Sequence, residues 1–517
     1  MTLDPITREV MAHTFAGIAE EMGLVLIHSA VSPNIRERRD ASAALFDAAG
    51  DMIAQAAHIP VHLGALADAV AAVRAERPSP GELYIVNDPY AGGSHLPDLT
   101  LVGVIRTAEG VGGFSVVRAH HSDVGGVTPG SMPAGARELY AEGIVVPPLP
   151  LTPEVERMLL ANVRTPEVRR ADLAAQRAAV ERGAEAMWSL AARLGWSFVN
   201  QAARDLMDDA ERRTRAALAR LPRGSATETD WLEGDGVTDA DIPITVRVEI
   251  RDGTLHADFA GTAPAAPGNV NCPLAVTRAA VLFAVQTLVG EDTPMNAGVT
   301  RAVHVTAPKG CLVHATRPSA VAAGNVETSQ RIADVVMRAL GSLGVAVPGQ
   351  GQGTMNNLAF GAAATPTRAE WTYYETLGGG QGGGPGGEGP SGVHVGMSNT
   401  RNTPIEVLES EYPMRVRRYA LRAGSGGAGL HPGGQGVIRE YEMLAAAEAT
   451  ILTERRRHAP RGSHGGAGGA PGRNLLNDQP VASKANLRLD AGDVIRIETP
   501  GGGGWGVGGV NTAKEER

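Results

Sequence analysis

Residues 81–107 read GELYIVNDPYAGGSHLPDLTLVGVIRT, and this stretch sets the expected architecture. The runs LYIV and LTLVGVIRT are apolar and rich in β-branched residues, which predicts two strands. The segment between them contains aspartates, a histidine, glycines and prolines, with neither helical nor strand period. Loops that are held by rigid elements often carry catalytic or binding groups. We therefore expect a functional polar loop between two strands of a sheet.

The surrounding sequence extends this picture in both directions. Apolar residues at helical spacing predict a helix over residues 5–24, with Asp4 as its N-cap and Pro5 in its first turn. The run AALFDAAGDMIAQ, from Ala43, predicts a hairpin, and a helical pattern follows Gly64. GGFSVVRAHHSDVGG predicts a third strand after the two that flank the loop.

The centre of the chain alternates between helical and strand patterns. Residues 152–221 are rich in Ala, Leu, Glu and Arg at helical spacing, with interruptions near Thr165-Pro166 and Gly195, which predicts about three helices. Residues 244–259 alternate around Asp252-Gly253, a typical type I′ hairpin signal. Two further helices are expected at 276–289 and 325–343.

Glycine dominates the sequence beyond about residue 350. The chain has 66 glycines among 517 residues, and stretches such as LGGGQGGGPGGEGPSG and TPGGGGWG concentrate them near the C-terminus. Strand-like runs are threaded between the clusters, which favours tight loops over flexible linkers. We predict a multidomain α+β protein with four parts: a metal-site region (1–150), a helical segment (151–225), an α+β middle domain (226–350) and a glycine-rich, mainly β region (351–517).

Composition excludes several classes of function. Hydrophobic residues make up 43%, charged residues 20% and aromatic residues 4%, and the net charge is -9, which disfavours nucleic-acid binding. The chain contains no G-x-x-x-x-G-K-[ST] frame for a phosphate-binding loop. With two cysteines, no secretory signal pattern and no long apolar run, a cytoplasmic protein without a membrane segment is expected.

Four polar residues form the best candidate site. His95 and Asp98 make an H-x-x-D pair, His120 follows in RAHHSDVGG, and Asp40 lies upstream in NIRERRDAS. Imidazole and carboxylate together suit zinc, manganese or iron(II). The spacing alone leaves other readings open, because Asp98 can cap a turn, His120 can be a core histidine and Asp40 can pair with a neighbouring arginine.

Other histidines and glycines are weaker candidates. Neighbouring side chains of a strand point to opposite faces, so His121 should face away from a metal held by His120, and Asp123 is better placed for acid-base work. His58 and His62 are separated by Pro60, which argues against a shared helical face and against a ligand role. No G-x-S-x-G elbow or dinucleotide-binding context is present.

Several long blocks resemble the hydantoinase B/oxoprolinase family in order and spacing. They are RERRDASAALFDAAGDMIAQAAHIPVHLGAL, NDPYAGGSHLPDLTL, HHSDVGG, EGIVVPP, SAVAAGNVETSQRIADVV, NTPIEVLESEYP and TPGGGGWG. The resemblance implies a subunit of an ATP-dependent enzyme that hydrolyses cyclic amides such as hydantoin or 5-oxoproline. It also implies an ATP-binding partner of the hydantoinase A type, assembly into a hetero-oligomer, and a divalent metal at Asp40, His95, Asp98 and His120.

The implied chemistry is reasonable for an amide. Phosphorylation of the amide oxygen creates a better electrophile, and a divalent ion can lower the pKa of the attacking water. Asp123 or Glu142, the latter in EGIVVPP, could accept a proton, although such carboxylates more often cap a helix or pair with arginine. Related carboxylases act on ketones with similar parts, so that activity and a non-catalytic structural role remain alternatives.

Overall fold

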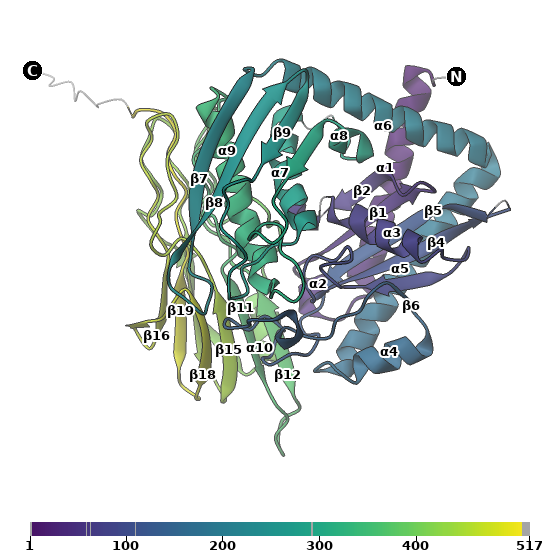
Figure 1. Ribbon diagram of the computed structural model, residues 1–517. Coiled ribbons are helices and arrows are strands. Elements are labelled where there is room, and N and C mark those ends of the chain that lie inside the picture. Colours follow the sequence, from purple (N-terminus) through teal and green to yellow (C-terminus); the bar gives the residue numbers. More distant parts are fainter. Residues whose placement is uncertain (1–2, 58, 63, 109, 291–292, 509–517) are drawn as a thin grey trace, which may run out of the picture.

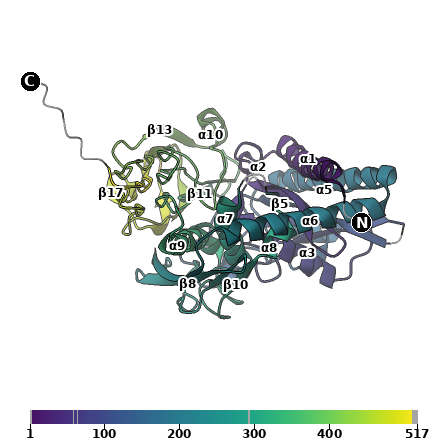
Figure 2. The same cartoon turned by 90° about the horizontal axis from the view of Figure 1, so that it is seen from above.

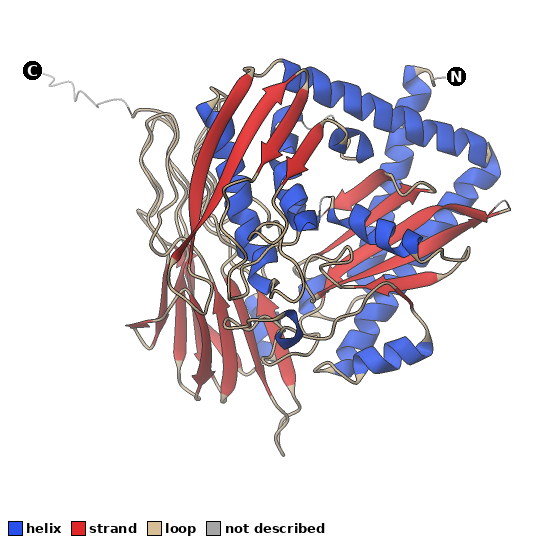
Figure 3. Cartoon of the chain, in the orientation of Figure 1, coloured by secondary structure: helices blue, strands red, loops and turns tan. Residues whose placement is uncertain are grey.

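The computed structural model of the chain describes residues 3–57, 59–62, 64–108, 110–290 and 293–508. Within these residues, helices and several separate sheets form a mixed α/β, multidomain architecture (Figures 1 and 3). This agrees with the predicted fold class.

The N-terminal part contains a six-stranded antiparallel sheet in which both faces are covered. Leu101 and Val117 contribute to the core on the side of α5, whereas Val102 and Val116 pack on the side of α3. The strands lie in the spatial order β2 (Met52–Ala57), β1 (Ala41–Asp47), β5 (Gly110–His120), β4 (Asp98–Thr107), β3 (Leu83–Val86) and β6 (Leu149–Pro150).

Long helices cover one face of this sheet, and a shorter helix covers the other (Figures 1 and 2). The expected interruptions are present, because α5 begins at Pro166 and α6 follows Gly195. These helices share the apolar core of the sheet. The bounds are α1 (Pro5–Ser29), α2 (Pro33–Arg36), α3 (Ala65–Ala75), α4 (Pro153–Leu160), α5 (Pro166–Leu194) and α6 (Trp196–Ala219).

Helix α1 begins as the sequence predicts and runs further. The Asp4 carboxylate accepts hydrogen bonds from the backbone N–H groups of Ile6 and Thr7, and Pro5 opens the first turn. Among the described residues, α1 is the one helix long and apolar enough to cross a membrane. Core helices of water-soluble proteins reach the same length and apolarity, and the face of α1 with Phe15 and Met22 packs into the core beside α5.

The middle part is a second sheet covered by helices. Its expected hairpin turns at Asp252 and Gly253, which both adopt positive φ, 48° and 70°. β9 and β10 pair in parallel, and the other neighbours are antiparallel. The elements are β7 (Gly224–Glu233), β8 (Asp241–Arg251), β9 (Thr254–Asp258), α7 (Leu274–Val289), α8 (Ala297–Thr300), β10 (Val303–Thr306), a π-helical turn (Gly324–Thr328) and α9 (Ser329–Ser342).

Two further sheets and a group of glycine-rich loops form the C-terminal part, green to yellow in Figure 1. The loops are tightly packed, as expected: the N–H groups of Gly502, Gly503 and Gly504 donate to carbonyls of three different segments, at Gly434, Gln350 and Ala467. The elements are β11 (Asn357–Ala362), β12 (Trp371–Glu375), α10 (Ile405–Glu411), β13 (Met414–Leu421), β14 (Val437–Met443), β15 (Ala447–Leu452), β16 (Arg473–Leu476), β17 (Gln479–Pro480), β18 (Lys484–Leu489) and β19 (Val494–Glu498).

Candidate metal centre

Three of the four residues singled out in the sequence converge on one point. His95 Nε2 lies 3.2 Å from His120 Nδ1, and each of these nitrogens lies 3.3 Å from Asp98 Oδ1. All three side chains are buried. Among the described residues, this is the group of histidine and carboxylate side chains whose ligand atoms lie close enough together to hold an ion.

The antiparallel sheet explains this convergence. Asp98 is the first residue of β4 and His120 the last of β5, and the two are direct cross-strand partners. Asp40 precedes β1, and its carbonyl accepts a hydrogen bond from the N–H of His120, 3.0 Å long. Residues distant in sequence therefore meet at one end of neighbouring strands.

The loop before β4 is held in place by Asn87 and by close packing at Gly93. The Asn87 amide donates to the carbonyls of Leu96 and Ile144, and its oxygen accepts from the N–H of Val146. A Cβ at Gly93 would lie 2.2 Å from the Asn87 carbonyl oxygen, which leaves no room for a side chain. These contacts fix the position of His95 relative to the sheet.

His62 is an additional neighbour that the sequence did not predict. Its Nε2 lies 3.5 Å from Asp98 Oδ2 and its Nδ1 lies 2.9 Å from Ser42 Oγ. A short 3-10 turn over Pro60–His62, rather than a longer helix, brings it to the site. His58 lies outside the described residues. The sequence shows the H-x-x-x-H spacing of His58 and His62. Proline argues against a shared helical face, but it does not exclude a short turn that brings His62 to the site.

The second oxygen of Asp98 is held by other polar groups. Ser94 Oγ donates to Oδ2, and the amide of Asn325 lies 3.5 Å away, on the π-helical turn before α9. Oδ1 is thereby left on the side of His95 and His120. Polar groups around a metal ligand commonly fix its orientation in this way.

Burial sets the protonation states of the cluster. It lowers the pKa of His120 to about 3 and also lowers that of His62, so both imidazoles are neutral near neutral pH. Burial acts to raise the pKa of Asp98, but the charge of His95 and hydrogen bonds from His120 and His62 outweigh it and hold that pKa well below its usual range. A neutral His120 imidazole beside an ionised Asp98 carboxylate is the form in which these two side chains bind a cation.

Asp40 lines the same small cavity as Asp98 and His120, outside the tight group of three. Burial raises the pKa of Asp40 to about 7, in spite of the opposing charge of Arg38. The cavity measures about 20 Å³, room for about one water or ion. Tyr374 closes one side, with its ring stacked on His120 at 4.4 Å between centroids.

The geometry fits a divalent ion. A tetrahedral ion with bonds of ~2.0–2.1 Å places its ligand atoms about 3.3 Å apart. The three distances between His95, Asp98 and His120 are 3.2–3.3 Å.

The two candidate proton acceptors have structural partners. Asp123 pairs with Arg164 at 3.0 Å and accepts from the N–H groups of Gly125 and Gly130. Glu142 Oε1 accepts from the N–H groups of Val321 and Ala322, at 2.9 and 2.8 Å, where the helix that precedes α9 begins. The alternatives noted for such carboxylates, an arginine partner and a helix cap, are thus both present.

His121 points away from the cluster, as strand alternation predicts. Its Nε2 lies 2.9 Å from the side-chain oxygen of Gln176 on α5. Burial lowers the pKa of His121 to about 4. It therefore belongs to the packing between the sheet and α5.

Sequence comparison gives relatives along almost the whole chain. The 5-oxoprolinase 1 of Arabidopsis thaliana is 36% identical over 97% of this chain, which spans 42% of that longer protein. A putative D-/L-hydantoinase subunit of Pseudomonas sp. is 31% identical and is matched over 98% of this chain and 90% of its own length.

Solved structures show the same fold. The ATP-dependent caprolactamase from Pseudomonas jessenii superposes with a TM-score of 0.89 at 28% identity, over 98% of this chain and 92% of that chain. Acetone carboxylase superposes with a TM-score of 0.86 at 16% identity, over 97% and 76%, which is a likeness of fold. The family model described as hydantoinase B/oxoprolinase matches residues 4–508, and the chain belongs to that family.

Proposed function

We propose that this chain is the metal-dependent hydrolytic subunit of an ATP-dependent enzyme that opens a cyclic amide, such as a hydantoin, 5-oxoproline or another lactam. The convergence of His95, Asp98 and His120 carries the proposal, because their ligand atoms lie 3.2–3.3 Å apart. The relatives named for 5-oxoprolinase and hydantoinase activity, and the likeness to a caprolactamase, support the substrate class.

In this proposal His95 Nε2, Asp98 Oδ1 and His120 Nδ1 hold a divalent ion, and Asp40 is the fourth ligand. Zinc, manganese and iron(II) all accept such ligands. When bound, the ion supplies Lewis-acid chemistry and lowers the pKa of water. His62, Ser94 and Asn325 keep Asp98 oriented.

The chain's own groups handle the proton. Asp40, whose pKa is about 7 in the absence of an ion, would give up its proton when it binds the ion. The further roles of Asp123 and Glu142 as proton acceptors stay proposals, and the arginine and backbone partners of these carboxylates weigh against them. Tyr374 and the surrounding apolar residues exclude bulk water from the site.

Activation of the amide oxygen requires ATP. We assign ATP binding and this activation to a partner subunit of the hydantoinase A type in a cytoplasmic hetero-oligomer. The relative named as a hydantoinase subunit and the lack of a phosphate-binding lysine loop in this sequence support the partner. Such a partner would supply this chain with a phosphorylated lactam.

Metal analysis and turnover together test the proposal. The chain is co-expressed with a candidate ATPase-like subunit of the hydantoinase A type, and lactam-dependent ATP consumption is measured with 5-oxoproline, hydantoin and caprolactam. His120→Ala should bind little metal and lose product formation at least about a thousandfold while its circular dichroism stays unchanged. His304→Ala, an exposed position on β10, is the matched control.

Two arms separate the alternatives. Ketone with bicarbonate replaces the lactam in a parallel assay, and turnover in that arm alone would assign a carboxylase, the activity named for the neighbour at 16% identity. Metal binding and turnover that survive His120→Ala would refute the proposed site and leave a structural role.

A further inference from the structure

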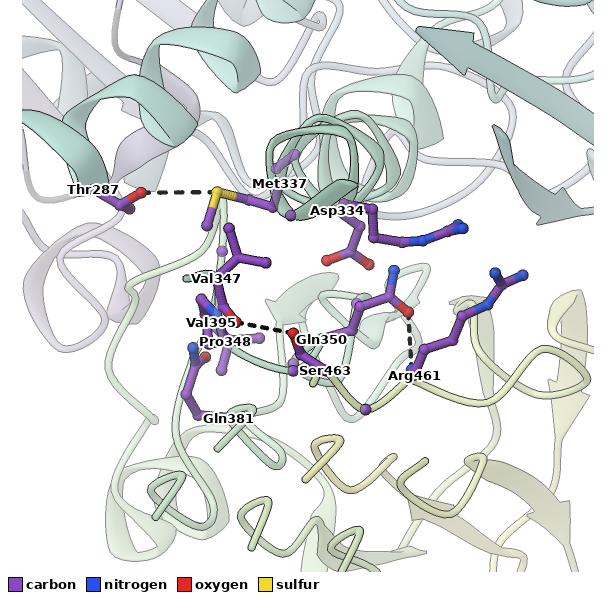
Figure 4. Close-up of a pocket in the computed structure, with 18 of the residues that line it drawn as sticks. Thr287, Asp334, Met337, Val347, Pro348, Gln350, Gln381, Val395, Arg461 and Ser463 are labelled. Atoms are coloured by element: carbon purple, nitrogen blue, oxygen red, sulfur yellow. Dashed lines mark hydrogen bonds between the residues drawn. The ribbon is translucent and has the colours of Figure 1, made fainter. Parts of the chain in front are cut away.

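A second cavity, of about 530 Å³, lies between α9 and the glycine-rich loops of the C-terminal part (Figure 4). Its volume is within the range of about 300–1,000 Å³ that small-molecule sites occupy. The cavity beside the candidate ligands measures about 20 Å³, too small for an organic molecule. The larger cavity is therefore the place in this region where such a molecule fits.

Three segments run from this cavity to the candidate metal centre. On the first segment, the π-helical turn followed by α9, Asn325 lines the centre and Asp334 lines the cavity. The segments 349–355 and 395–400 likewise line the cavity at one end and the centre at the other. Gln330 stands between them, donating to the carbonyl of Val395 and accepting from the N–H of Met397. The two spaces are therefore lined by different parts of the same three segments.

Most polar side chains of the cavity wall already have partners. Gln350 donates to Asp230 and accepts from the N–H of Arg461, and Ser463 donates to the carbonyl of Val347. Arg338 pairs with Glu228, which also accepts from Ser342. These groups shape the wall and are not available to a ligand.

Three polar groups remain available. The partners of Asp334 in the described part of the chain all contact Oδ2, including Arg455 at 2.6 Å, and its carboxylate points into the cavity (Figure 4). The Arg461 guanidinium has no ion pair among the described residues and lies 5.8 Å from the Trp231 ring. The amide of Gln381 also lines the space.

Apolar residues occupy the rest of the wall. Met337, Val347 and Pro348 lie on the side away from Arg461 in Figure 4. A wall that offers one carboxylate, one guanidinium and an apolar surface complements a small aliphatic molecule with an ammonium and a carboxylate.

We propose that this cavity binds an amino acid of the kind that opening of a lactam releases. The inference rests on the proposed function, because hydrolysis of a lactam gives one molecule with both a carboxylate and an amine. Arg461 binds the carboxylate, Asp334 Oδ1 accepts from the ammonium, and Met337 contacts the methylenes. The cavity then serves as a product chamber beside the metal centre.

Calorimetric titration of the complex tests the assignment with 6-aminohexanoate and glutamate as probes. Hexanoate and hexylamine, which each carry one charge, are the ligand controls. We expect at least one of the two amino acids to bind about tenfold more tightly than either control, and Arg461→Gln to weaken that binding about tenfold. Arg457→Gln, which removes an exposed arginine paired with Asp241 outside the cavity, should leave binding unchanged.

Metal content separates this inference from the proposed function. Arg461→Gln should keep the metal content of the parent. Equal binding of amino acids and singly charged controls, or unchanged binding in Arg461→Gln, would overturn the chamber even if lactam turnover is intact. Loss of turnover in His120→Ala with amino-acid binding retained would support both sites as separate. A parent that binds the amino acids selectively but turns over no lactam would support the cavity and refute the reaction.

Discussion

The loop around His95 and the glycine-rich segments near the C-terminus both need glycine for close backbone packing. The packing serves a different purpose in each region. A Cβ at Gly93 would lie 2.2 Å from the Asn87 carbonyl oxygen, and one at Gly502 would lie 2.0 Å from that of Gln381. Around Gly502 the backbone groups of neighbouring segments satisfy one another. Around Gly93 the tight backbone instead presents buried imidazole and carboxylate groups to one cavity. Close packing by glycine therefore marks a rigid scaffold, and the ionisable side chains mark the site.

A single added methyl group should lower the free energy of unfolding more in the glycine-rich segments around Gly502 than in the loop around His95. Gly502→Ala puts a Cβ against backbone atoms that cannot move independently, because Gly502 also donates to Gly434 and accepts from Gly427. We expect the free energy of unfolding to fall by about 3 kcal/mol or more, measured by urea denaturation. Gly386→Ala is the control, since a Cβ there has no neighbour within 4 Å and its unfolding curve should stay near the parent's.

The same substitution in the polar loop should affect two properties at once. Gly93→Ala displaces the Asn87 carbonyl, so we expect a loss of about 2 kcal/mol together with reduced metal content, measured by urea denaturation and elemental analysis. Gly17→Ala in α1, where a Cβ has open space, should slightly raise stability and leave metal content unchanged. Full metal content in Gly93→Ala would show that the loop does not position His95.

Much of the fold around these two regions could be predicted from local sequence. Apolar, β-branched runs predicted the strands around the loop, Asp252-Gly253 predicted a hairpin, and Pro166 and Gly195 marked helix boundaries that the structure confirms. These signals act over a few residues, where propensity and turn chemistry dominate.

The details of the candidate site depend on long-range packing and could not be predicted in the same way. His62 reaches Asp98 through a short turn on a different segment, and the backbone partners of Glu142 come from residues about 180 positions further along. The residue types of the site were visible in the sequence, but their partners follow from strand register and from the docking of the middle part.

The contribution of His62 is the next point to test. His62→Ala removes the imidazole beside Asp98 Oδ2 without removing one of the three converging ligand atoms. We expect metal affinity, measured by competition with a chelator, to fall about tenfold. The exposed His304→Ala serves as the control. An unchanged affinity would mean that Ser94 and Asn325 orient Asp98 without help.

The smallest expected effect concerns the pH dependence of stability at Glu142. Burial raises the pKa of this carboxyl to about 8, against the opposing effect of the N–H groups of Ala322 and Val321. Its pKa in the unfolded chain is about 4.3. A raised folded pKa gives stability that is fully present below the unfolded pKa and is lost as pH rises through the folded pKa. Stability should therefore fall between about pH 5 and 8.

Glu142→Gln removes this ionisation and keeps an oxygen for both backbone N–H groups. Between about pH 6 and 7 the parent should lose about 1 kcal/mol relative to the variant, measured by urea denaturation at both pH values. Parallel curves would mean that the carboxylate is already ionised in the folded chain. That result would also bear on catalysis. A carboxyl group that is protonated at neutral pH cannot accept a further proton, whereas an ionised Glu142 could.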